Sequence, residues 1–191
     1  HPSIKTNFFT SEPLGNIPGH NGKTAIVGDA EGEIESLLLA CVTLGCDIIG
    51  IEKTKINNQD IQYVKILPKD DTSFHLIILG DILHRGGLGL NILVTILELI
   101  KMCKNNPNQK ITFTAGNHDI VHFKCDSQTT RIHTCNIAPC ICETQNDSTA
   151  FQIIKTIFSN LQNPDIVGYN TLKLCHYIPE QNRIYTHGLI T

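Results

Sequence analysis

Short apolar runs and helically spaced apolar stripes alternate along the chain. The runs at residues 24–28, 74–79 and 110–114 are bounded by turn-forming and polar residues, which predicts three buried strands. Apolar residues recur at helical spacing over residues 33–44, 88–104 and 150–161, which predicts three helices. The stripe of Leu88, Ile92, Ile96 and Ile100 makes the second helix amphipathic, and Gly45 suits the left-handed residue that follows the first.

Other segments follow different patterns. Residues 47–67 hold two apolar segments around the polar stretch 57–60, which predicts a β-hairpin with one exposed face. Further strands are expected at residues 172–177 and 183–186. The Pro- and Gly-rich residues 1–22 predict an irregular arm, and residues 120–147 are polar without a period.

Buried strands that alternate with helices predict an α/β layered fold. We expect one domain over residues 23–191, with insertions at 47–67 (the hairpin) and 120–149. In such folds the functional loops gather at the carboxyl ends of the strands.

Composition excludes several classes of protein. The chain has 191 residues, of which 41% are hydrophobic and 17% charged, so it is not a disordered chain. The net charge of −3 provides no basic field, and no nucleic-acid partner is expected. Residues 88–100 form the longest apolar stretch, which Asn91 and Glu98 interrupt, so no membrane partner is expected either.

The eight Cys residues divide into two groups. Cys41, Cys46, Cys103 and Cys175 sit among apolar residues or at the ends of predicted elements, which favours reduced thiols and an intracellular protein. The other four lie with two His residues in a segment whose spacing fits zinc ligands only loosely. An insertion loop is favoured there over a structural zinc site or a disulfide. The Cys and His residues of that segment are His122, Cys125, His133, Cys135, Cys140 and Cys142.

Polar side chains with chemical potential follow the predicted strands. Taken singly, a Gly-Asp after a strand is usually a turn, but four such motifs in order are hard to assign to chance. Together they offer carboxylates, an amide and imidazoles, a ligand set that suits a pair of divalent ions such as Mn, Fe, Zn or Mg. The residues are Asp29 and Glu31 after the first strand, Asp81, His84 and Arg85 after the second, Asn117, His118 and Asp119 after the third, and His187 after a later one.

These motifs resemble those of the calcineurin-like metallophosphoesterases, and most closely those of the phosphoprotein phosphatase branch, the serine/threonine phosphatases. The family pattern is Gly-Asp-x-His-Gly, Gly-Asp-x-x-Asp-Arg-Gly, Gly-Asn-His-Glu and a later His-Gly-Gly. The corresponding segments here are Gly28–Gly32, Gly80–Gly86, Gly116–Asp119 and His187–Leu189. The resemblance covers residues 24–119 well and 150–191 loosely. It implies a β-sandwich flanked by helices.

The resemblance also implies a role for each matching residue. Asp81 would bridge two metal ions, of which Asp29 and Glu31 complete the first, and Asn117 and His187 bind the second. Arg85 and Asn117 would hold the substrate phosphate. His118 would protonate the leaving oxygen as general acid, and His84, beside it, is a second catalytic candidate.

Two positions depart from the family pattern. Glu31 replaces a His, which favours harder ions, so we expect Mn, with Fe, Zn or Mg as alternatives. His84 replaces an Asp that supports the charge of the catalytic His. It would either lower the pKa of His118 or act itself as ligand or acid, in a Glu31/His84 exchange of roles. The family also has a metal-binding His beyond His187, so we expect the natural protein to be longer than this chain.

Two functions follow. The first is a metal-dependent phosphatase that hydrolyses phosphomonoesters, expected to be those of phosphoproteins, by direct attack of metal-activated water. The alternative is a catalytically inactive phosphatase fold that serves as a binding module. We expect a cytoplasmic protein, with a pathogen effector released into a host cell as the alternative. The motifs determine neither the oligomeric state nor which phosphoester is the substrate.

Overall fold

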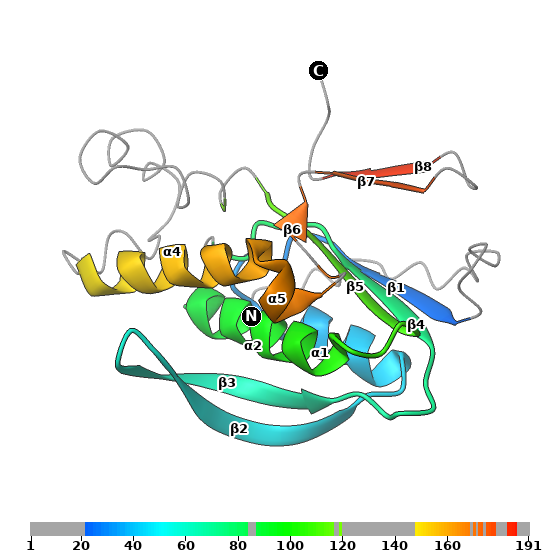
Figure 1. Ribbon diagram of the computed structural model, residues 1–191, viewed down its shortest axis with the longest axis horizontal. Helices are drawn as coiled ribbons and strands as arrows, with labels where there is room; N and C mark the ends of the chain where they lie inside the picture. The colour runs from blue at the N-terminus through cyan, green and yellow to red at the C-terminus, as the bar shows by residue number, and fades with distance from the viewer. Residues whose placement is uncertain are drawn as a thin grey trace, which may run out of the picture.

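The computed structural model describes residues 22–83, 87–116, 119, 148–168, 170, 172–173, 175–178 and 183–186. Its elements form a mixed α/β fold with one parallel sheet and two antiparallel pairs of strands (Figure 1). Of the arm predicted at residues 1–22, only residue 22 is described, and residues 120–147, which include the Cys/His segment, lie outside the described residues. Among those that are described, no helix is long and apolar enough to cross a membrane.

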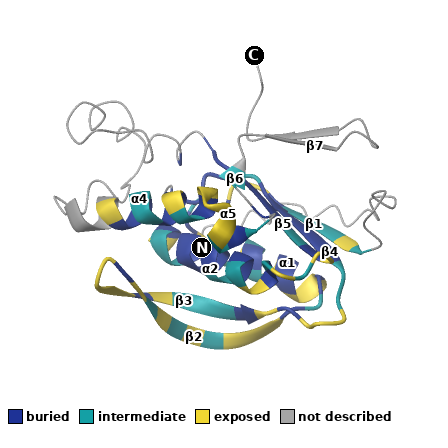
Figure 2. Ribbon diagram, in the orientation of Figure 1, coloured by how far each residue is buried: buried dark blue, intermediate teal, exposed yellow. Residues whose placement is uncertain are grey.

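The parallel sheet contains the three strands that the apolar runs predict. They are β1 (Lys23–Val27), β4 (Phe74–Ile78) and β5 (Gln109–Thr114), and the short strand β6 (Leu172–Lys173) follows β5 at the edge. The order is β1-β4-β5-β6, with every neighbouring pair parallel. All of β4 is buried (Figure 2), as expected for the interior of a parallel sheet.

The predicted hairpin is present with the expected bounds, and its strands extend further toward the turn than the pattern suggested. Strand β2 (Asp47–Ile56) pairs with β3 (Gln59–Leu67) through a turn of two residues, Asn57 and Asn58, with φ of 51° and 64°. Because Asn tolerates this left-handed backbone, Asn57 and Asn58 form a tight turn by themselves. Only the first half of the polar stretch 57–60 therefore belongs to the turn. Gln59 and Asp60 belong to β3 because they pair with Ile56 and Lys55.

Helices α1 (Glu35–Thr43), α2 (Gly89–Cys103) and α4 (Ser148–Gln162) lie between the parallel sheet and the hairpin (Figure 1). Helix α2 contacts β5 on one side and β3 on the other, and residues 92–97 are all buried. The amphipathic pattern expected for α2 is therefore wrong in one respect. Its second face is also covered, and Leu88, expected on the buried stripe, is 47% exposed.

Of the two C-terminal strands predicted, one has the expected bounds and the other is divided. The strand expected at 172–177 is two strands, β6 and β7 (Cys175–Ile178), of which β7 pairs antiparallel with β8 (Arg183–Thr186). The short helix α5 (Pro164–Val167) was not predicted, although it carries common start signals. Pro164 is in its first turn, and the Asn163 side chain accepts a hydrogen bond from the Asp165 N–H at 2.9 Å.

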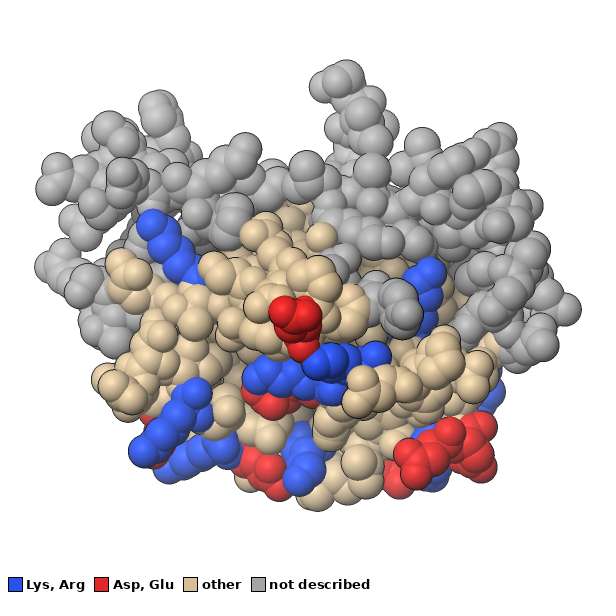
Figure 3. All heavy atoms as spheres, in the orientation of Figure 1, with Lys and Arg blue, Asp and Glu red and all other residues tan. Residues whose placement is uncertain are grey.

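The core is one contiguous cluster of apolar side chains from the sheet, the helices and the inner face of the hairpin. Cys41, Cys46 and Cys103 belong to it as buried free thiols, in the apolar surroundings expected for them. On the face shown in Figure 3, the described acidic and basic side chains are interspersed. That distribution agrees with the small net charge of the chain.

Candidate functional site

The loops after β1 and β4 meet at one edge of the parallel sheet. Because β1, β4 and β5 are adjacent and parallel, their carboxyl ends lie side by side. The Leu79 N–H donates to the Val27 carbonyl at 2.9 Å, and beyond it the Glu31 N–H donates to the Asp81 carbonyl at 2.9 Å. Two candidate metal ligands, from loops 50 positions apart in the chain, are therefore joined directly through their backbones.

Glu31 and Asp81 both have left-handed backbone conformations, with φ of 44° and 49°. Such conformations are rare outside Gly, Asn and Asp, and they concentrate at functional sites and tight turns. The other non-glycine residues with positive φ among the described ones are Asn57 and Asn58, which the hairpin turn explains. Asp81 is also only 5% exposed, so its carboxylate is held at a fixed and largely buried position.

Two glycines allow the loops after β4 and β5 to approach closely. A Cβ atom at Gly80 would clash with the backbone nitrogen of Gly116, and Gly80 has a φ of 91°. A Cβ atom at Gly116 would clash with the backbone nitrogen and Oδ1 of Asp81. The Asp81 carboxylate can therefore take this position only because residue 116 lacks a side chain.

Asp119 ties the same two loops together. Its Oδ1 accepts hydrogen bonds from the N–H groups of Ile82 (3.0 Å) and Leu83 (3.2 Å), and its Oδ2 accepts one from the Gly116 N–H (3.0 Å). The side chain is fully buried. Burial and the nearby Asp81 charge raise the pKa of Asp119, and the three backbone donors lower it. The result of these effects together is a pKa of about 6.

In the third motif, the sequence indicated chemical roles for Asn117 and His118. It did not indicate that the Asp119 carboxylate positions the loops. The available signal was its spacing from Gly116. A side chain three residues on can reach back to a backbone N–H, as in a helix capping box. The sequence does not show that the same carboxylate also reaches Ile82 and Leu83, since those residues come from another loop.

The described residues include three of the predicted site residues. Asp29 is exposed in the loop after β1, Glu31 is half-buried, and Asp81 is buried after β4. The backbone hydrogen bond from Glu31 to Asp81 joins their two loops. Asp29 lies in the same loop as Glu31, between Glu31 and the end of β1. The remaining predicted site residues lie outside the described part of the chain. They are His84, Arg85, Asn117, His118 and His187.

The residues present fit a cation site in their chemistry. Three carboxylates follow adjacent strand ends, and oxygen ligands suit Mn and Mg. The Asp81 carboxylate lies where a side chain at position 116 would stand, so its position depends on Gly116. Within the described ranges, however, no group of three or more His, Cys, Asp and Glu side chains is arranged to hold a metal ion. Asn117 and His187, two of the five expected ligands, fall outside those ranges.

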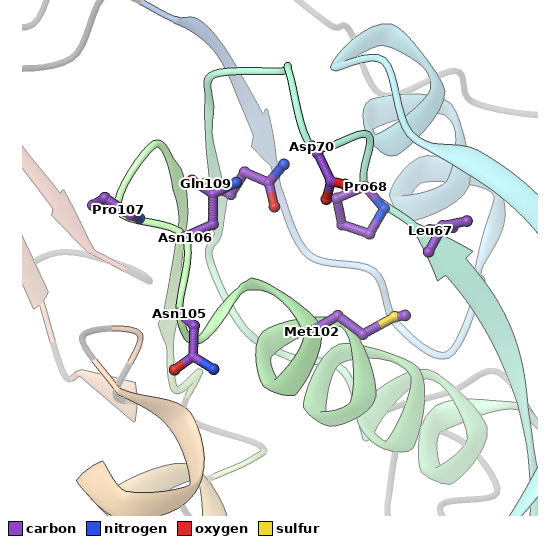
Figure 4. Close-up of a pocket in the computed structure, with 8 residues that line it drawn as sticks. All are labelled: Leu67, Pro68, Asp70, Met102, Asn105, Asn106, Pro107 and Gln109. Carbon is purple, nitrogen blue, oxygen red and sulfur yellow. The ribbon is translucent and has the colours of Figure 1, made fainter.

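A pocket of about 380 Å³ lies elsewhere, near the amino ends of β4 and β5 (Figure 4). It is open, and its lining comes from the connection before β4 and from the connection between α2 and β5. None of the predicted site residues takes part. The lining residues are Leu67, Pro68, Asp70, Met102, Asn105, Asn106, Pro107 and Gln109.

No family model, curated protein or solved structure matches this chain. The candidate site therefore rests on the geometry of the strand ends and on the residues that occupy them.

Proposed function

We propose that this protein is a metal-dependent phosphatase of the calcineurin-like metallophosphoesterase type, with the β-sandwich architecture of that family. The observation that supports this function best is the backbone bond between Glu31 and Asp81. It brings together two acidic residues on left-handed backbone at adjacent strand ends. A turn alone can account for left-handed backbone, as at Asn57 and Asn58, but it does not require the buried carboxylate of Asp81.

The expected ligands follow from the motifs. Asp29, Glu31 and Asp81 would hold the first of two divalent ions, and Asp81, Asn117 and His187 the second. Mn is the expected metal, with Fe, Zn or Mg as alternatives. When bound, such ions supply a water of lowered pKa and offset the charge of the phosphate.

The chain's own residues have separate tasks in this proposal. Arg85 offers a planar pair of N–H donors that matches two phosphate oxygens, and Asn117 adds a third donor. His118 gives its proton to the leaving oxygen, a transfer that contributes about 10²–10⁴-fold to a rate. Asp119 is a positioning residue, since it holds the backbone directly after Asp81 and the backbone directly before Asn117.

A binding module without catalysis is the second candidate. Glu31 in place of the family His and His84 in place of the family Asp favour it, because both changes fall on residues that the family uses in catalysis. Such a module would still bind a phosphorylated partner through Arg85 and Asn117. The two candidates differ in turnover and in metal content.

The test measures hydrolysis of an aryl phosphate, an alkyl phosphate and a phosphoserine peptide by the purified protein in added Mn²⁺, with the bound metal counted by mass spectrometry. We expect turnover with two ions per chain. Asp81→Asn should lose metal and at least 10²-fold in rate while it stays folded, since Asn also tolerates left-handed backbone. The control is Asp71→Asn, which should match the wild type, because Asp71 is exposed and lies before the amino end of β4, away from the carboxyl ends of the strands.

A second comparison isolates the general acid. An alkyl leaving group needs protonation far more than an aryl one, so His118→Asn should slow the alkyl phosphate much more than the aryl phosphate. Equal losses on both substrates would contradict the assignment of His118. A protein that neither binds metal nor hydrolyses any of the substrates in Mn²⁺ would overturn the enzyme and leave the binding module.

A further inference from the structure

Three buried thiols lie together at the end of α1, away from the strand-end loops. Cys41 is in the last turns of α1, Cys46 immediately precedes β2, and Cys103 ends α2. Their exposures are 0%, 4% and 1%, and all three are free thiols. The proposed phosphatase chemistry uses none of them.

The backbone at the end of α1 fixes the first two thiols relative to each other. The Gly45 N–H donates to the Val42 carbonyl at 3.0 Å, and the Cys46 N–H donates to the Cys41 carbonyl at 2.9 Å. Gly45 has a φ of 93°. Together these features form a Schellman motif, in which the residue after the glycine packs on the helix residue five positions earlier. Both residues of that contact are cysteines here.

The same hydrogen bond limits the distance between the two α-carbons. Adding the backbone lengths from N to Cα and from O to Cα to its 2.9 Å gives at most about 6.8 Å. Disulfides span Cα–Cα distances of about 4.4–6.8 Å. The pair therefore needs no rearrangement of the backbone to be within reach of a disulfide.

The two sulfurs differ in acidity. A side-chain hydrogen bond with Cys41 lowers the pKa of Cys46, while burial of the Cys46 thiol raises it. The charge of Asp47 also raises this pKa, and the charge of Lys69 lowers it. The same hydrogen bond and burial raise the pKa of Cys41, and the charges of Cys46 and Cys103 add to the rise. Cys46 is thus the better nucleophile of the pair, and it is also the slightly exposed one.

We propose that Cys41 and Cys46 are a reversible oxidation site, which hydrogen peroxide converts to a disulfide. The Cys46 sulfur attacks one peroxide oxygen, the O–O bond breaks, and a sulfenic acid forms with release of water. The Cys41 sulfur then attacks the Cys46 sulfur, the S–O bond breaks, and the hydroxide leaves as a second water with the Cys41 proton. Two thiols lose two electrons and one peroxide gains them.

Cys103 is the natural internal control. It lies in the same buried cluster, but it comes from α2, whereas Cys41 and Cys46 share the backbone hydrogen bond at the end of α1. Burial and the charge of Cys46 raise its pKa to about 12, so it is a poor nucleophile. A merely random oxidation of buried thiols would pair it with Cys46 as readily as Cys41.

The test treats the reduced full chain with hydrogen peroxide, blocks free thiols under denaturing conditions and digests with trypsin. Residues 24–53 form one tryptic peptide that holds Cys41 and Cys46, whereas Cys103 falls in the peptide of residues 102–104. We expect the 24–53 peptide to become two hydrogens lighter and unblocked, and to return to the dithiol with a phosphine reductant. A 24–53 peptide that stays in the dithiol form, or is joined to 102–104, overturns the proposal.

Variants extend the test. Cys103→Ser should leave the oxidation of the 24–53 peptide unchanged, while Cys41→Ala should let Cys46 stop at a sulfenic acid that a dimedone probe traps. Since the wild-type mass decides the matter alone, a variant that fails to fold does not remove the test. The result is independent of phosphatase activity, so failure of either proposal leaves the other standing.

Discussion

At the scale of single residues, Asp119 has a larger structural part than its sequence motif indicates. Its buried carboxylate satisfies three backbone N–H groups, two in the loop that contains Asp81 and one in the loop after β5. Buried N–H groups are costly to leave without an acceptor. Asp119 therefore stabilises the loop geometry that the proposed site needs, without itself touching the substrate.

Replacing Asp119 should lower stability by an amount that depends on the acceptors lost. Asp119→Asn keeps one oxygen for Ile82 and Leu83 but turns an NH₂ group toward the Gly116 N–H, so we expect a loss of about 1–3 kcal/mol in the free energy of unfolding. Asp119→Ala should lose more. Urea denaturation measures both, with exposed Asp71→Asn as the control, which should change by less than about 0.5 kcal/mol. An Asp119→Asn protein as stable as the wild type would show that the carboxylate does not stabilise the loops in this way.

The pKa of Asp119 predicts a pH dependence for the metal-free protein. The carboxyl has a folded-state pKa of about 6 against an ordinary value of 3.8. Because the fold raises it, this contribution to stability is fully present below pH 3.8 and is lost as the pH rises through 6. We expect the wild type to lose about 1 kcal/mol more than Asp119→Asn between pH 5 and pH 7 in chelator. Parallel curves for the two proteins would refute the raised pKa.

At the scale of elements, the carboxyl ends of β4 and β5 approach more closely than side chains permit. A Cβ atom at Gly116 would clash with the Asp81 carboxylate and also with the Asp81 backbone nitrogen, which cannot turn away as a side chain could. The equivalent glycine after β1, Gly28, has open space around its Cβ position. The Gly28-Asp29 and Gly116-Asn117 motifs are therefore similar in sequence, but of these two glycines only Gly116 is needed for the close approach of two loops.

This difference gives a matched pair of substitutions. Gly116→Ala should cost about 1–3 kcal/mol of folding stability and weaken Mn²⁺ binding, because Asp81 must move. Gly28→Ala should change stability by less than about 0.5 kcal/mol. Thermal unfolding with and without Mn²⁺ measures both effects. Equal effects of the two substitutions would show that the close approach is unimportant.

At the scale of the whole molecule, the hairpin β2–β3 acts as a layer of the fold. Ile61 and Ile66 of β3 are buried in the common core, and the Thr95 hydroxyl of α2 accepts a hydrogen bond from the Val64 N–H at 3.1 Å. Helix α2 is buried between this hairpin and the parallel sheet. Although residues 47–67 have the pattern of an inserted hairpin, the core depends on them.

Replacing residues 48–66 by a short Gly-Ser linker should therefore prevent soluble folding, since it exposes one apolar face of α2. Size-exclusion chromatography and circular dichroism of the shortened chain provide the measurement. The control is Ile51→Thr, a change on the 72% exposed outer face of β2, which should fold as the wild type does. A soluble, cooperatively unfolding shortened chain would make the hairpin dispensable.

The sequence by itself determined the elements whose signals are local. Apolar runs located β1, β4 and β5, helical spacing located α1, α2 and α4, and Gly45 ended α1 in the left-handed conformation expected of it. Such features depend on the chain within a few residues, because hydrogen bonding and side-chain periodicity act at that range. The motifs also placed Asp29, Glu31 and Asp81 at strand ends, since each directly follows a recognisable apolar run.

Only the tertiary structure decided which of these features meet. The bond from Glu31 to Asp81, the three donors on Asp119 and the covering of α2 on its second face all join residues far apart in the chain. Local pattern carries no information on such pairs, since they depend on strand order and on how layers pack. The burial of a carboxylate, and with it the raised pKa of Asp119, is likewise a property of the assembled layers.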